Sequence, residues 1–232
     1  MVCAMVGTTL LFLKHKPRLS RITQIVIIMH KDEFVNDKSV PLNSNGIIFL
    51  ISNCSTGLDI NLFPSEGFYP SLGCPHCADF HLSVVPRLEE EYVNKGLLRI
   101  VFVNFPLDKK AMQAALLLQC ASVDNYHGLL SRLFDKQRFW YLSSDTTPLH
   151  SYAAEYGISY DEAESCLHND AMAQTIISDR QQGLKQLGMT GTPALLFSGR
   201  DGNEIIYSAA SFGTIKEYLN SRYERMGISL NK

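Results

Sequence analysis

Apolar and polar residues alternate along this chain in blocks that predict an α/β protein. Residues 47–51 and 97–105 are short, nearly continuous apolar runs, which is the composition of buried strands. Residues 194–197 and 204–208 have strand composition and flank a glycine-containing turn, so they predict a β-hairpin. Residues 52–67 are rich in Asn, Ser, Gly and Pro, and we predict a loop there.

Helical periodicity occupies most of the remaining chain. Residues 75–95 predict one helix that is kinked at Pro86, because a proline removes a hydrogen bond from a helix interior. Residues 214–226 predict a helix that closes the chain. The long interval between the second strand and the hairpin has little strand signal and predicts five amphipathic helices, at 109–122, 126–136, 148–156, 160–167 and 169–187.

The first 32 residues predict a leader that is a candidate signal peptide or membrane anchor. Residues 1–13 and 22–29 are apolar and enclose a basic cluster, but neither run reaches the ~20 residues that cross a bilayer as a helix. If the true start lay near Lys14, the basic cluster and the second apolar run would resemble a short export signal. The alternative is an unstructured leader or an incorrectly assigned start.

Composition narrows the classes of function. The 232 residues are 46% apolar, which is enough for a sizeable core, and the net charge is −2 without a long charge run, so we expect no nucleic-acid partner. The number of cysteines is too small for a disulfide-built scaffold but sufficient for a redox pair and a structural bridge, which fits an oxidising compartment. The six cysteines are Cys3, Cys54, Cys74, Cys77, Cys120 and Cys166.

The segment Cys74-Pro75-His76-Cys77 is the strongest chemical signal in the chain. It opens the predicted helix, with Pro75 at the first helical position, where a missing N–H costs nothing. Cys74 would then lie beside the unpaired N–H groups of the helix start, which stabilise a thiolate and make a Cys74–Cys77 disulfide a stronger oxidant. His76 would add to this effect if its ring or its backbone N–H points toward the Cys74 sulfur.

Two other interpretations of the cysteine pair are buried structural thiols and half of a zinc site. No second CxxC or HxxxH stands at the usual zinc spacing, so we expect redox chemistry and no metal. Gly191-Thr192-Pro193-Ala194 immediately precedes a predicted strand. Taken alone, a proline at the start of a strand is a weak signal, because most X–Pro bonds are trans and many such prolines are edge residues.

Combined, these features resemble the DsbA family of thiol–disulfide oxidoreductases, in particular its alphaproteobacterial forms, over roughly residues 68 to 226. The resemblance is carried by the CPHC segment, Asn104-Phe105-Pro106-Leu107, residues 137–140 and Gly191-Thr192-Pro193. It implies a thioredoxin-like domain formed by residues 33–107 and 188–232, with an inserted all-helical subdomain at 108–187. It also implies that Pro193 is cis and lies against the cysteine pair, and that the Thr192 backbone pairs with an extended substrate.

The resemblance further implies an enzyme that donates its disulfide to folding, cysteine-containing exported proteins in the periplasm, where its N-terminus is a candidate membrane anchor. A quinone-linked membrane protein of the DsbB type would reoxidise it, no bound cofactor would be required, and we expect a monomer. Relatives of this type often carry a second disulfide in the helical subdomain, which implies a Cys120–Cys166 bond. Cys3 and Cys54 are interpreted as incidental.

The approach to the cysteine pair departs from the family pattern. Family members commonly have a strand running into the motif with an acidic residue six positions before the first cysteine, where this chain has Phe68, and Glu66 lies two residues earlier. Residues 53–67 therefore resemble an insertion, with 47–51 as a displaced remnant of the strand. The alternatives to a disulfide donor are a disulfide isomerase or reductase, and a noncatalytic redox-sensitive binding protein with a degraded site.

Overall fold

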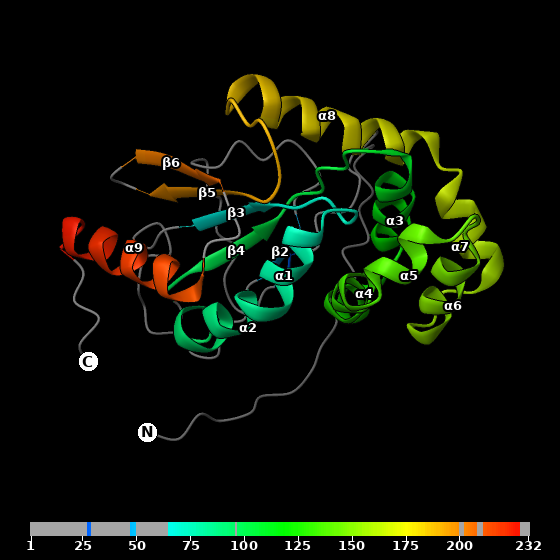
Figure 1. The fold of residues 1–232 in the computed structure, drawn as a ribbon, viewed down its shortest axis with the longest axis horizontal. Helices are drawn as coiled ribbons and strands as arrows, with labels where there is room; N and C mark the ends of the chain where they lie inside the picture. Colours follow the sequence, from blue (N-terminus) through cyan, green and yellow to red (C-terminus); the bar gives the residue numbers. More distant parts are fainter. Residues whose placement is uncertain are drawn as a thin grey trace, which may run out of the picture.

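The computed structural model describes residues 27–28, 47–49, 65–95, 97–199, 202–207 and 211–227. Cys3, Cys54 and most of the predicted leader lie outside these ranges. Within them, six strands form one mixed sheet in the order β1-β2-β4-β3-β5-β6 (Figure 1). Its strands are β1 Ile27–Ile28, β2 Ile47–Phe49, β3 Ser65–Tyr69, β4 Arg99–Phe102, β5 Ala194–Gly199 and β6 Gly202–Tyr207.

The strand that leads to the cysteine pair, β3, lies inside the sheet. It pairs in parallel with β4 and antiparallel with β5, and β5 continues into the hairpin strand β6. Phe68 of β3 is fully buried, and its ring lies 5.1 Å from that of Phe80 and 5.3 Å from that of Phe102. The cysteine pair is therefore held by a strand that is paired on both sides.

This arrangement corrects two sequence predictions. The predicted loop at 52–67 is wrong at its end, because Ser65, Glu66 and Gly67 are ladder residues of β3. Residues 47–49 are not a displaced remnant of that strand, since they form β2, which pairs antiparallel with β4. Pairing with two neighbours compensates for the poor strand propensity of Ser and Gly, and Pro70 follows the last ladder residue, where it interrupts nothing.

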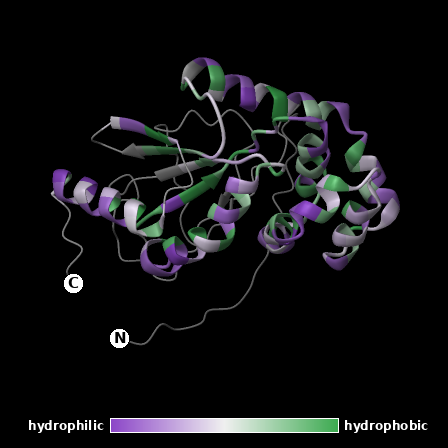
Figure 2. Ribbon diagram, viewed as in Figure 1, coloured by the Kyte–Doolittle hydropathy of each residue, from purple (hydrophilic) through white to green (hydrophobic). Residues whose placement is uncertain are grey.

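The helix after the cysteine pair is divided near Pro86, as the sequence predicted. Helix α1 spans Pro75–Ser83, α2 spans Val85–Leu88, and a π-helical turn, η2, follows at Glu89–Val93. These segments and the last helix, α9 Phe212–Arg225, lie along one face of the sheet (Figure 1). Figure 2 shows the apolar strand β4 beside them and mixed polar and apolar positions along α9, as expected for a helix with one face in solvent.

A set of helices is inserted between β4 and β5. They are α3 Lys109–Gln119, α4 Val123–Asp135, α5 Gln137–Leu142, α6 Thr147–Glu155, α7 Tyr160–Leu167 and α8 Asp170–Gln186. The short helix α5 is the one that the periodicity did not predict. Among the described residues, none of the helices combines the length and apolarity needed to cross a membrane.

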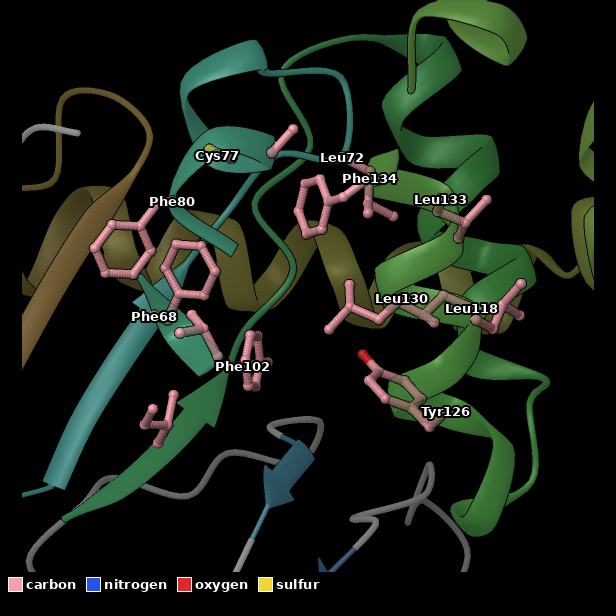
Figure 3. Close-up of a cluster of buried hydrophobic side chains, with 14 of the residues drawn as sticks. Phe68, Leu72, Cys77, Phe80, Phe102, Leu118, Tyr126, Leu130, Leu133 and Phe134 are labelled. Atoms are coloured by element: carbon pink, nitrogen blue, oxygen red, sulfur yellow. The ribbon is translucent and has the colours of Figure 1, made fainter. Parts of the chain in front are cut away.

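One buried cluster joins the sheet to the inserted helices. It runs from Phe68 and Phe80 to Phe134 and Tyr126 of α4 (Figure 3). His81 of α1 lies in the same contact region, where its Nε2 is 2.9 Å from Ser131 Oγ and its ring lies 4.9 Å from that of Phe134. Because α1 carries the cysteine pair, this shared core fixes the pair relative to the insertion.

Candidate redox site

The backbone turns sharply between β3 and α1. The Cys74 N–H donates to Ser71 O over 3.0 Å, and Cys74 is the N-cap of α1 with extended backbone angles (φ −89°, ψ 119°). Pro75 follows at the first helical position, as predicted, and the Cys77 N–H donates to Cys74 O over 3.1 Å. We call residues 71–77 the redox turn. It places the Cys74 sulfur at the positive end of the α1 dipole.

The two thiols of the redox turn have opposite acidities. The pKa of Cys74 falls from 9.0 to about 5, first because the Cys77 thiol donates to its sulfur, with burial opposing the change. Smaller contributions come from the Thr192 side chain and the backbone N–H groups of Cys77 and His76. The pKa of Cys77 is raised, first by burial and then by its interaction with Cys74. Cys77 is 0% exposed and Cys74 is 9% exposed.

His76 and Pro75 are exposed at the surface of the redox turn. Of the two routes considered for His76, its backbone N–H is the one that stabilises the Cys74 thiolate.

The loop before β5 completes the site. The Thr192–Pro193 peptide bond is cis, Pro193 is buried, and Thr192 O accepts a hydrogen bond from the Cys74 thiol at 3.5 Å. Two segments more than 100 residues apart, the CPHC segment and the Thr192-Pro193 segment, are thus brought together, as the sequence resemblance implied. The resulting site is a thiolate held between a helix start and a cis-proline loop.

The sequence profile described as thioredoxin matches residues 68–218. The chain belongs to the thioredoxin family. A putative protein-disulfide oxidoreductase of Rickettsia typhi is 28% identical over 144 residues, which are 60% of this chain and 52% of that protein. A relative with the same description from Rickettsia felis is 28% identical over 160 residues, 66% of this chain and 55% of the relative. The chain therefore spans about half the length of these curated relatives.

Solved structures confirm the predicted resemblance to DsbA proteins at the level of the fold. The chain aligns with α-DsbA1 of Wolbachia pipientis at a TM-score of 0.64 and 24% identity, covering 70% of this chain and 87% of that one. It aligns with BdbD of Bacillus subtilis at a TM-score of 0.59 and 19% identity, covering 69% and 88%. The chain thus has a thioredoxin-like domain with a helical insertion.

Sequence reasoning missed one residue that contacts the redox turn of this thioredoxin-family protein. Gln137, at the start of α5, is 8% exposed, and its Nε2 donates to Leu72 O over 2.6 Å and to Cys74 O over 3.0 Å. The stretch containing Gln137 contributed to the family resemblance, but no spacing rule connects it with a turn more than 60 residues earlier.

A buried acid lies near β3, although it is not at the position expected from the family pattern. Phe68 occupies that position and packs in the core. Asp179 of α8 is buried, which raises its pKa to about 7. The pKa of Tyr69, the last residue of β3, rises to about 12 through burial and the nearby Asp179 carboxylate. Asp179 belongs to α8, which is far from β3 in the sequence, so no sequence pattern singled it out.

The second cysteine pair lies within the insertion. Cys120, the C-cap of α3, and Cys166, in the last turn of α7, form a disulfide with a Cα–Cα distance of 6.3 Å. The disulfide joins α3 to α7 across a sequence separation of 46 residues. The structure therefore separates a free cysteine pair at a helix start from a bonded pair at two helix ends.

Proposed function

We propose that this chain is a protein thiol–disulfide oxidoreductase that donates the Cys74–Cys77 disulfide to proteins with free cysteines. The observation that carries the proposal is the opposite acidity of two adjacent thiols, with the pKa of Cys74 lowered to about 5 and that of Cys77 raised. Such a pair favours the reduced form, and a dithiol that is stable when reduced is an oxidant when it carries a disulfide. The relatives described as putative protein-disulfide oxidoreductases support the same activity.

The reaction begins with a substrate thiolate that attacks the Cys74 sulfur of the oxidised pair. The Cys74–Cys77 bond breaks, a mixed disulfide forms, and Cys77 leaves and takes up a proton, as its raised pKa favours. A second substrate thiolate then attacks the substrate sulfur of the mixed disulfide. Cys74 leaves as a thiolate, which its lowered pKa favours. Two electrons have passed from two substrate thiols to the Cys74–Cys77 pair, and the substrate holds the new disulfide.

The cis-proline loop is proposed to hold an extended substrate segment. Thr192 O accepts from Cys74 only while that thiol is protonated, and neither the thiolate nor a mixed disulfide has a proton to donate. The carbonyl is then free to accept a backbone N–H of the substrate, in the manner of an added β-strand. Substrates with an unfolded stretch around the reacting cysteine fit this geometry better than folded ones.

The cellular setting is part of the proposal. Each turnover leaves the pair reduced, so an electron acceptor must regenerate it, and a DsbB-type membrane protein would supply that step. A structural disulfide such as Cys120–Cys166 is typical of an oxidising compartment. We therefore propose that the protein works on exported proteins in the periplasm, as a monomer.

Two measurements test the proposed activity. The absorbance of the thiolate in reduced protein, followed against pH, gives the pKa of Cys74, which we expect near the value of about 5 set by its surroundings. The oxidised protein is then mixed with a fluorescent peptide carrying two thiols, and oxidation should far exceed that by glutathione disulfide at equal concentration. A Cys74 pKa near the ordinary ~8.5 with no peptide oxidation would leave only a noncatalytic binding protein. Faster reshuffling of a scrambled disulfide protein than peptide oxidation would favour an isomerase.

A further inference from the structure

Helix α5 of the insertion begins directly against the redox turn. Its first residue, Gln137, is buried, and one side-chain nitrogen lies 2.6 Å from Leu72 O and 3.0 Å from Cys74 O. An amide NH₂ group has two hydrogens, so both carbonyls can be satisfied at once. The two carbonyls flank Gly73 and therefore fix the backbone on both sides of the residue that precedes the reactive cysteine.

The same face of α5 also covers Gly73. Tyr141 is four residues after Gln137, a spacing that places both side chains on one face of a helix. A Cβ atom at Gly73 would lie only 2.6 Å from Tyr141 Cε2, so the ring would have to move to admit any larger residue. The Tyr141 hydroxyl donates to Asp108 Oδ2 over 2.9 Å, which connects this face to the N-cap of α3.

Helix α5 is itself held in place by α3. Lys110 Nζ donates to Tyr141 O over 2.6 Å and to Ser143 O over 2.7 Å. These two hydrogen bonds satisfy carbonyls at the end of α5 that have no partner within the helix. These contacts with α3 therefore hold Gln137 against the redox turn.

The carbonyl that Gln137 contacts belongs to the reactive cysteine. Cys74 O also accepts from the Cys77 N–H at 3.1 Å and from the Ala78 N–H at 3.2 Å, which are the first hydrogen bonds of α1. The orientation of this carbonyl is coupled to that of the first turn of α1, whose His76 and Cys77 N–H groups stabilise the thiolate. A neutral amide with its positive end toward the redox turn also favours negative charge nearby.

We propose that Gln137 is a positioning residue for Cys74, through which the helical insertion holds the redox turn in the geometry that stabilises the thiolate. The consequence for catalysis rests on the proposed function of the Cys74–Cys77 pair. The effect on the acidity of Cys74 is independent of the proposed function, because it can be measured without any substrate. The insertion thereby contributes to the chemistry of the site as well as covering it.

The test compares two replacements of Gln137 with a matched control. Gln137→Met keeps the length of the side chain and removes both donors, and Gln137→Glu keeps the shape but puts a negative charge beside the redox turn. Gln119 of α3 is also 8% exposed, and its Nε2 has no hydrogen-bond partner among the described residues, so Gln119→Met is the control. Reduced proteins are titrated by thiolate absorbance, and Cys74 alkylation by iodoacetamide is timed at pH 5.

We expect Gln137→Met to raise the pKa of Cys74 by roughly 1 and to slow alkylation at pH 5 roughly fivefold, since the thiolate fraction falls accordingly. Gln137→Glu should raise the pKa further, because its charge repels the thiolate. Gln119→Met should titrate like the wild-type protein, whatever its melting temperature. Thermal unfolding identifies any unfolded variant, and if Gln137→Met does not fold, Gln137→Leu, which also removes both donors without adding charge, takes its place.

Unchanged titration of Cys74 in a folded Gln137 variant would overturn the positioning role, even if that variant melts at a lower temperature. A wild-type pKa near ~8.5 would instead overturn the proposed function. The two failures are therefore distinguishable in one set of titrations.

Discussion

The two cysteine pairs of the described chain lie at opposite ends of helices. Cys74 is the N-cap of α1, where unpaired N–H groups and the helix dipole favour a thiolate. Cys120 is the C-cap of α3, and Cys166 lies in the last turn of α7. At both positions the helix dipole disfavours a thiolate. The first pair is free and the second is bonded. The same residue type is thus reactive at a helix start, where the Cys77 thiol and backbone N–H groups stabilise the Cys74 thiolate, and structural at two helix ends, where the sulfurs are bonded.

The largest difference between the pairs should be in activity. Cys74→Ser removes the sulfur that forms the mixed disulfide, so oxidation of a dithiol peptide should fall to the rate without protein. The double variant Cys120→Ser/Cys166→Ser leaves the redox turn intact and should keep most of the wild-type rate. Stopped-flow fluorescence of the peptide measures both. Equal loss of activity in the two proteins, with native circular dichroism in each, would contradict the division of roles.

For stability we expect the reverse: loss of the insertion disulfide should lower the free energy of unfolding more than loss of the Cys74–Cys77 disulfide. The insertion disulfide closes a loop with a sequence separation of 46, which constrains the unfolded chain by about 4 kcal/mol in the entropy model. The double variant Cys120→Ser/Cys166→Ser should lose about that free energy of unfolding, whereas loss of the short Cys74–Cys77 bridge should not lower stability, because the folded protein favours the reduced pair. Urea unfolding of the oxidised proteins gives both values. An unchanged free energy of unfolding in the double variant would show that the insertion disulfide is dispensable for stability.

Two glycines allow a finer comparison of the redox turn with a second position in the insertion. A Cβ atom at Gly73 would meet Tyr141 Cε2 at 2.6 Å, and one at Gly128 of α4 would meet Tyr156 Cε1 at 2.5 Å. Each alanine variant should lose about 1–3 kcal/mol of stability because a packed ring must move. Only Gly73→Ala should also change the rate of Cys74 alkylation. A similar change of rate in Gly128→Ala would mean that any strain in the insertion reaches the redox turn.

Much of the fold follows from local sequence signals. The bounds of α7 were predicted at both ends, and the structure shows a capping box there in which Ser159 and Glu162 satisfy each other's backbone N–H groups. Strand β3 was not predicted, because its stability comes from two neighbouring strands rather than from its own composition. Strand pairing between residues more than 100 positions apart leaves no local pattern.

The residues of the redox site likewise divide into those that the sequence could predict and those that it could not. The helix-start position of Cys74 and the approach of Thr192 could be predicted, because the CPHC and Thr192-Pro193 segments carry characteristic residues. Gln137 could not be assigned a role, since a buried amide acts through backbone carbonyls and leaves no motif in the residues it contacts. The acidity of Asp179 likewise depends on burial, which a sequence pattern around one residue does not reveal.

A further difference between the pairs is in the pH dependence of stability. The pKa of Cys74 is lowered from 9.0 to about 5, so between these values the unfolded chain binds a proton that the folded reduced chain does not. Stability from this group should therefore rise with pH, be complete above about 9 and disappear as the pH falls through 5. The bonded pair does not titrate. Cys77 has a raised pKa, so its opposite effect begins only near pH 9.

Urea unfolding at several pH values between 5.5 and 8.5, in reduced glutathione, isolates this contribution when the wild-type protein is compared with Cys74→Ser. Asp179 has a pKa raised from 3.8 to about 7, so its contribution falls with pH in that window, but it is common to both proteins and cancels in the difference. The stability difference in favour of the wild type should grow with pH, and Cys120→Ser/Cys166→Ser should retain the wild-type slope. Parallel curves for wild type and Cys74→Ser would mean that the start of α1 does not stabilise a thiolate, and the contrast between the two helix ends would lose its physical basis.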